Sequence, residues 1–88
     1  MLVVTLVTID GCTLCKKVEQ LLSSVASGRN FKLEIRSLGE DEELQSKYLL
    51  RIPVVIVDGV EVFEAKDMDL AGLWRDRLER ILTGRTSA

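Results

Sequence analysis

Histidine is absent from this 88-residue sequence, and cysteine occurs only twice, at Cys12 and Cys15. A tetrahedral zinc site takes about four nitrogen, sulfur or oxygen ligands. Two thiols in a monomer would fill only half of such a shell, and carboxylates, a second chain or an external thiol would have to supply the rest. The sequence therefore predicts no resident metal site, and no motif in it indicates a bound cofactor.

Blocks of like charge and long apolar runs are also missing. Twelve Lys and Arg stand against fourteen Asp and Glu, a formal net charge of −2, so that no strong basic segment forms and nucleic acid is not expected as a partner. No run approaches the roughly 18–20 apolar residues of a membrane span. The apolar start, Met1 to Ile9, lacks the basic region and cleavage site of a signal peptide. We expect a cytoplasmic protein that does not associate with a membrane.

Linkers and repeats are missing as well. No Pro-, Gly- or Ser-rich stretch divides the chain, and its 47% hydrophobic and 30% charged residues are typical of a globular protein. This length supports one modest hydrophobic core. We predict a single domain over residues 1–88, and we expect it to be a monomer.

The two cysteines that are present fall in one window, Cys12-Thr13-Leu14-Cys15, where a strand-like run gives way to a helix-like one. A thiol at the start of a helix lies beside unpaired N–H groups and the positive end of the helix dipole, which favour the thiolate. The i, i+3 spacing brings the two Cα atoms within the roughly 4.4–6.8 Å that a disulfide needs. The window therefore predicts a pair that cycles between dithiol and disulfide. Two buried core cysteines are the structural alternative.

The spacing of apolar residues switches repeatedly between strand-like and helix-like. The predicted elements are a strand Leu2–Ile9, a helix from Thr13 that Ser27-Gly28 ends, a strand Phe31–Arg36, a short helix with Glu40–Glu43 in its first turn, strands Ile52–Val57 and Val60–Phe63, and a helix from Asp69 to Leu82 that Gly84 ends. Asp58-Gly59 is expected to form a hairpin turn, and Trp74 to pack in the core. The order β-α-β-α-β-β-α predicts an α/β fold with a mixed four-stranded sheet and helices on both faces.

Taken together, the motifs resemble the thioredoxin superfamily, and above all its small glutaredoxin-like members. They are similar to a bacterial-type group with the pattern Gly-Cys-x-Leu-Cys, then Tyr shortly before Arg-(Val/Ile)-Pro-Val, then an apolar strand that ends in Asp-Gly. The matching residues are Gly11-Cys12-Thr13-Leu14-Cys15, Tyr48, Arg51-Ile52-Pro53-Val54 and Asp58-Gly59. The resemblance runs from Leu2 to about Leu82 and implies a thioredoxin-like fold.

The resemblance also implies an activity, that of a glutaredoxin-like thiol-disulfide oxidoreductase. Cys12 would be the nucleophile and Cys15 the resolving thiol. The peptide bond before Pro53 would be cis, placing the backbone of Ile52 where an extended substrate can pair with it. The implied substrate-binding residues are Gly11, Thr13, Leu14, Arg51, Ile52 and Pro53. The implied partners are protein or low-molecular-weight disulfides and a thiol reductant, either a thioredoxin reductase system or glutathione.

Two departures from the glutaredoxin pattern concern glutathione. Glutaredoxins carry a basic residue three positions before the first cysteine, where this chain has Ile9, and a Gly-Gly pair near the last helix, which residues 60–67 lack. We therefore expect weak recognition of glutathione. The charges near the first cysteine conflict, because Asp10 opposes thiolate formation there whereas Lys16 and Lys17 favour it.

Two other functions remain open at this stage. Soft thiolates in a Cys-x-x-Cys loop suit Cu(I) or zinc, which makes a metal carrier one alternative. Residues 11–15 followed by Val18-Glu19 are faintly similar to heavy-metal-associated domains, but those domains carry a Met where this chain has Asp10, and they end in a strand. The other alternative is a thioredoxin-fold interaction module whose cysteines no longer turn over.

Overall fold

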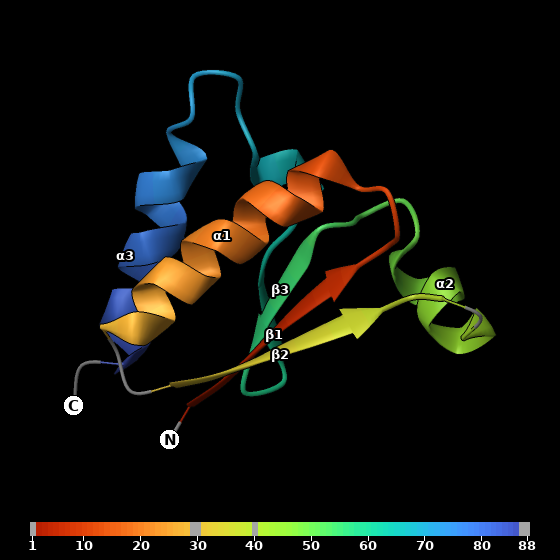
Figure 1. Ribbon diagram of the computed structural model, residues 1–88, viewed down its shortest axis with the longest axis horizontal. Coiled ribbons are helices and arrows are strands. Elements are labelled where there is room, and N and C mark those ends of the chain that lie inside the picture. The colour runs from red at the N-terminus through yellow and green to blue at the C-terminus, as the bar shows by residue number, and fades with distance from the viewer. Residues whose placement is uncertain (1, 29–30, 40, 87–88) are drawn as a thin grey trace.

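The computed structural model describes residues 2–28, 31–39 and 41–86, and a four-stranded sheet forms its centre. The strands are β1 (Leu2–Thr8), β2 (Phe31–Ser37), β3 (Val54–Val57) and β4 (Val60–Phe63). Their order in space is β2-β1-β3-β4, so that β1 and β3 are central (Figure 1). β1 pairs in parallel with β2 and antiparallel with β3. The predicted mixed sheet is therefore confirmed.

Helices cover both faces of the sheet, as predicted. α1 (Thr13–Ser27) and α3 (Trp74–Thr86) lie over one face, while α2 (Glu42–Tyr48) packs on the other at the end of β1 (Figure 1). The core under α1 and α3 includes Val4, Leu6, Val18, Leu22, Val55, Val57, Leu78 and Leu82, and the smaller one beside α2 includes Val7, Leu38, Tyr48 and Val54. β1 contributes to both, which explains its nearly continuous apolar run. Within the described residues, no helix is both long and apolar enough to cross a membrane.

α1 has the limits that the sequence predicts. Val18, Leu22 and Val25 recur at helical spacing and are buried against the sheet, and Gly28 follows the last residue as the C-cap. The first turn is different, because Leu14 is 44% exposed although it belongs to the same apolar pattern. The helix is thus anchored by its middle and its end, and its first turn is left open to solvent.

Asp58 and Gly59 form the turn between β3 and β4, as predicted. Their φ angles are 48° and 85°, the left-handed pair that a two-residue hairpin loop with the matching twist requires. The Asp58 carboxylate also accepts a hydrogen bond from the N–H of Val3 at 2.9 Å. This bond ties the hairpin to β1 and helps fix the register of the central strands.

α3 differs from its predicted limits at both ends. The Asp69 carboxylate accepts hydrogen bonds from the N–H groups of Leu73 at 2.9 Å and Trp74 at 2.7 Å, and these bonds lower the pKa of Asp69, that from Leu73 most. Asp69 therefore caps the helix instead of starting it, and Gly72, with a φ of 80°, breaks the helical path in between. At the other end the helix passes through Gly84, because an interior glycine costs no more than about 1 kcal/mol relative to alanine.

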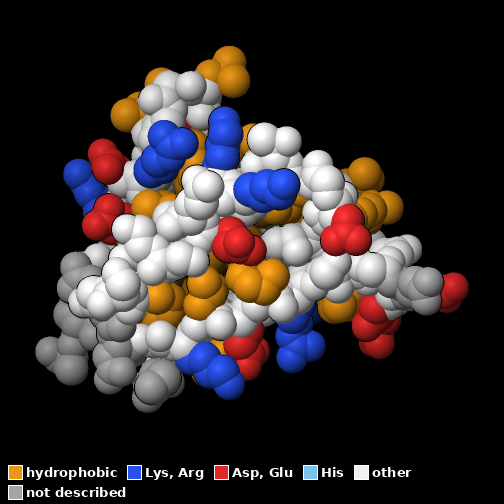
Figure 2. Space-filling model, viewed as in Figure 1, with side chains coloured by type: hydrophobic (Ala, Val, Ile, Leu, Met, Phe, Trp, Pro, Cys, Tyr) orange, Lys and Arg blue, Asp and Glu red, His pale blue; other side chains and the backbone are white. Residues whose placement is uncertain are grey.

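The loop before α3 projects from the molecule and carries apolar side chains (Figure 2). Leu70 is fully exposed and Leu73 largely so, although both were expected on the buried face of a helix. Trp74, by contrast, is buried with its ring centroid 5.9 Å from that of Phe63, which confirms its predicted core position. A short 3₁₀ helix, η1 (Ala65–Asp67), precedes the loop and was not predicted.

Smaller differences occur at the ends of other elements. β3 begins at Val54 rather than Ile52, because Pro53 has no N–H to donate to the sheet. The Ile52-Pro53 peptide bond is cis, as the resemblance implied. α2 begins at Glu42 behind Asp41, whose carboxylate accepts hydrogen bonds from two N–H groups of the first turn. The predicted first residue of its acidic run, Glu40, lies outside the described residues.

Candidate active site

A tight turn brings the chain from the end of β1 to the start of α1 and carries the first cysteine. The N–H of Cys12 donates to the carbonyl of Ile9 at 3.2 Å, and Gly11 within the turn has a φ of 79°. That conformation is one that side chains with a Cβ rarely adopt, so that glycine suits the position. Cys12 then stands as the N-cap of α1 in extended conformation. The turn thus delivers a sulfur to the open end of a helix.

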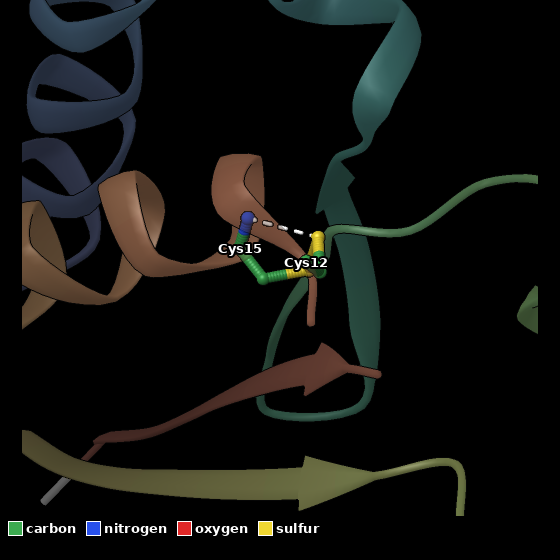
Figure 3. Close-up of a disulfide and its surroundings, with 2 residues drawn as sticks. All are labelled: Cys12 and Cys15. Atoms are coloured by element: carbon green, nitrogen blue, oxygen red, sulfur yellow. Dashed lines mark hydrogen bonds between the residues drawn. A yellow bond between two sulfur atoms is a disulfide. The ribbon is translucent and has the colours of Figure 1, made fainter. Parts of the chain in front are cut away.

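The two cysteines form a disulfide across the first turn of α1 (Figure 3). Their Cα atoms lie 5.3 Å apart, within the range that the spacing predicted. The Cys12 sulfur also accepts a hydrogen bond from the N–H of Cys15 at 3.0 Å. Cys12 is half-buried, whereas Cys15 is only 3% exposed and packs toward the core. The two sulfurs therefore differ in access to solvent although they are bonded to each other.

A shallow depression of about 190 Å³ lies beside the cysteines. Its lining residues are Thr8, Ile9, Asp10, Gly11, Cys12, Cys15, Lys16 and Glu19. Two carboxylates thus face a single cation there, and Lys17 is exposed but is not part of the lining. A wider depression of about 540 Å³ lies along α3 at Asp76, Glu79 and Arg80, and holds no thiol. We therefore take the smaller one as the site.

The segment before β3 runs beside the cysteine turn. Val54 pairs with Val7 near the C-terminal end of β1, so that Ile52-Pro53 and Cys12 lie at the same end of these two strands. Figure 3 shows the segment before β3 passing next to the disulfide. The side chain of Ile52 packs in the cluster beside α2. Its N–H and carbonyl form no hydrogen bond within the described part of the chain. The unpaired N–H and carbonyl of Ile52 therefore lie close to the sulfurs.

Arg51 is directed to β4 and to the segment after it. Its Nη2 donates to Glu64 Oε2 at 2.9 Å and also pairs with Glu61, and its Nε lies 3.3 Å from the same Glu64 oxygen. The hydrogen bond with Glu64 first, and that with Glu61 second, raise the pKa of Arg51, while Arg51 lowers the pKa of Glu64. The sequence reasoning named Arg51 but missed its two partners.

The hairpin that the sequence predicts around Asp58-Gly59 brings the residues before β3 opposite those after β4. This predicted hairpin is the one feature of the sequence that could have suggested a partner for Arg51 from the region after β4. The two other predicted contact residues, Thr13 and Leu14, follow Cys12 directly on the exposed first turn of α1. The structure therefore gathers Gly11, Thr13 and Leu14 around the disulfide and places Ile52-Pro53 beside it.

Comparison with known proteins agrees with this arrangement. The family described as Glutaredoxin-like domain (DUF836) matches residues 3–83, which is most of the chain. The chain belongs to this glutaredoxin-like family. A mutant thioredoxin from Halobacterium salinarum NRC-1 has a similar structure, with a TM-score of 0.68 at 22% sequence identity, and the alignment covers 99% of this chain and 76% of that one. No curated protein matches the sequence.

The family and the fold confirm the predicted resemblance. The glutaredoxin-like domain has a thioredoxin-like fold with its Cys-x-x-Cys pair at the first strand-to-helix junction. Membership of this family, together with the Cys-x-x-Cys pair, supports a function of the redox type. Across residues 2–28, 31–39 and 41–86, no three His, Cys, Asp or Glu side chains are grouped so that they could hold a metal ion.

Proposed function

We propose that the glutaredoxin-like domain is a thiol-disulfide oxidoreductase in which Cys12 exchanges with substrate disulfides and Cys15 resolves the mixed disulfide. The observation that best supports the proposal is that the two sulfurs differ in their access to solvent. Cys12 is half-buried at the N-cap of α1 and follows an exposed turn, whereas Cys15 is 3% exposed one helical turn further on. An external disulfide can therefore reach the first sulfur, and its adduct there comes within reach of the second.

The reaction begins from the dithiol. The Cys12 thiolate, favoured by the N–H groups of the first helical turn, attacks one sulfur of the substrate disulfide. The substrate S–S bond breaks, and the departing thiolate takes a proton from solvent. The Cys15 thiol then attacks the Cys12 sulfur, and its proton passes to the second substrate thiol as that thiol leaves. Two electrons have moved to the substrate, and the Cys12–Cys15 disulfide seen in the structure remains.

The reductant and the location belong to the same proposal. The disulfide must be reduced again after every turnover, so that an external thiol has to return two electrons. We place the reaction in the cytoplasm, where thiols are kept reduced. The substrates are protein or low-molecular-weight disulfides, and a thioredoxin reductase system is the first reductant to test.

Cys15→Ser is expected to trap the intermediate. The variant keeps the attacking thiol but lacks the resolving one, so that a peptide disulfide should leave one half of itself covalently attached to Cys12 in most molecules. Intact-mass analysis without reductant measures the adduct, and Cys12→Ser serves as the matched control that should form none. An adduct on Cys15 of the control chain would reverse the two roles. No adduct on either variant would remove the proposed function and favour a non-catalytic module.

Glutathione is expected to be a poor reductant for this domain. It is an anion at neutral pH, and the depression beside Cys12 offers Lys16 against both Asp10 and Glu19. Charge-assisted contacts contribute roughly 1.5–3 kcal/mol each, so the loss of two should weaken recognition by about two orders of magnitude or more. The measurement compares reduction of the Cys12–Cys15 disulfide by glutathione and by the neutral reductant dithiothreitol. A rate with glutathione as high as the rate with dithiothreitol would contradict this expectation.

A further inference from the structure

We propose that Arg51 is a positioning residue that holds the segment Arg51-Ile52-Pro53 in place for a protein substrate. This inference rests on the proposed function, since it concerns how a peptide disulfide is presented to Cys12. Arg51, Glu61 and Glu64 form a charged cluster, here called the Arg51 clamp, that joins the residues before β3 to β4 and to the start of η1. The segment that it holds is the one that passes beside the disulfide (Figure 3).

Both backbone groups of Arg51 are held by hydrogen bonds in addition to the clamp. Its N–H donates to the carbonyl of Tyr48 at 2.8 Å, and its carbonyl accepts from the N–H of Ala65 at 3.1 Å. The guanidinium also lies over the Tyr48 ring, 5.7 Å from the centroid. Glu64, the partner of Arg51, is itself held in place, because its N–H donates to the Asp67 carboxylate at 2.9 Å. Two segments that are distant in sequence, residues 48–51 and 61–67, therefore meet at the Arg51 side chain.

Ile52, the residue after Arg51, has the backbone groups with which a substrate would pair, and they are called here the Ile52 edge. The N–H and carbonyl of Ile52 have no partner in the described structure, while its side chain is held in the cluster beside α2. An extended peptide gains affinity by pairing its main chain with such an edge. The edge must be correctly placed relative to Cys12, because displacements of about 1 Å can cost up to 10²-fold in rate. A small disulfide without a peptide backbone has no need of it.

The charges of the clamp argue against a direct role of Arg51 in binding an anion. Two carboxylates, Glu61 and Glu64, face one guanidinium, and all three side chains are partly buried. The guanidinium is therefore already paired with two carboxylates, and an anionic ligand would have to compete with both of them for it. A positioning role and a binding role then predict opposite results when Glu64 is neutralised, because that change loosens the clamp and frees the cation.

The test compares a protein disulfide, that of insulin, with bis(2-hydroxyethyl) disulfide, which is small and neutral. Arg51→Met and Glu64→Gln are each expected to lower kcat/KM for insulin by about tenfold or more while staying within about twofold of the unmodified chain on the small disulfide. Arg51→Lys keeps the charge without the fork that reaches both carboxylates and should fall in between. Lys32→Met is the matched control. It removes a cation whose partner, Glu34, lies 3.5 Å away on β2, and it should leave both rates unchanged.

Two results would overturn the inference. Faster reduction of an anionic disulfide, such as oxidised glutathione, by Glu64→Gln would show that Arg51 binds substrate directly. Equal losses on insulin and on the small disulfide, with an unchanged circular dichroism spectrum, would assign the clamp to the thiol chemistry instead. Failure of the proposed function is recognised separately, because the unmodified chain would then reduce neither disulfide before any variant is compared.

Discussion

Cys12→Ser is expected to abolish disulfide exchange. A serine hydroxyl is not ionised at neutral pH and cannot form the mixed disulfide, and loss of a nucleophile typically lowers turnover by about 10³-fold or more. The rate of insulin reduction with dithiothreitol as reductant, corrected for dithiothreitol alone, measures the effect. The expected value is the uncatalysed background, because the remaining thiol of Cys15 is nearly inaccessible to a protein substrate.

Cys15→Ser is the matched control for this experiment, since it makes the same change of sulfur to oxygen one helical turn away. It should still react once with a disulfide and stop at the adduct, whereas Cys12→Ser should not react at all. Far-UV circular dichroism checks that both chains are folded. A Cys12→Ser chain that kept more than about a tenth of the activity would contradict the assignment of the nucleophile.

The largest loss of stability is expected from Trp74→Ala. The indole is 3% exposed, contacts the Phe63 ring, and is covered by the Arg75 guanidinium, whose Cζ lies 5.1 Å from the ring centroid. Truncation of a buried Trp typically costs about 3–5 kcal/mol, a large share of the roughly 5–15 kcal/mol that holds a domain together. Urea unfolding followed by far-UV circular dichroism measures the change, because the variant lacks the single Trp of the chain.

Leu70→Ala is the control for the same region. Leu70 lies four residues before Trp74 on the projecting loop and is fully exposed, so that its removal should change the free energy of unfolding by less than about 0.5 kcal/mol. A loss at Leu70 as large as that at Trp74 would contradict the exposed loop and restore the longer helix that the sequence suggests.

The contrast between α1 and α3 shows which parts of the fold the sequence could predict. For α1 the N-terminal loop, the apolar stripe and the closing glycine all indicate one helix, and agreement of this kind makes a prediction reliable. For α3 the helical spacing of apolar residues includes Leu70 and Leu73, which precede the first residue of the helix, Trp74. The start is set by the Asp69 carboxylate and by the left-handed backbone of Gly72, which apolar periodicity does not record.

The candidate site divides in the same way. Its thiol chemistry lies in four consecutive residues, and a local pattern was therefore sufficient to predict the disulfide between Cys12 and Cys15. The partners of Arg51 come from the far side of the hairpin. Their alignment depends on a register shift between Val55 and Ile56, and a single inserted residue of this type is not visible in the spacing of a short strand.

The order of the strands leaves β2 and β4 as the two edges of the sheet, and an open edge is a template on which other chains can add strands and aggregate. On β2, Lys32, Glu34 and Arg36 occupy alternate positions, and the first two form an ion pair at 3.5 Å. β4 is only four residues long and pairs with an irregular register. An incoming strand would meet a row of charges at one edge and a short, bent ladder at the other, and both features disfavour self-association through the sheet.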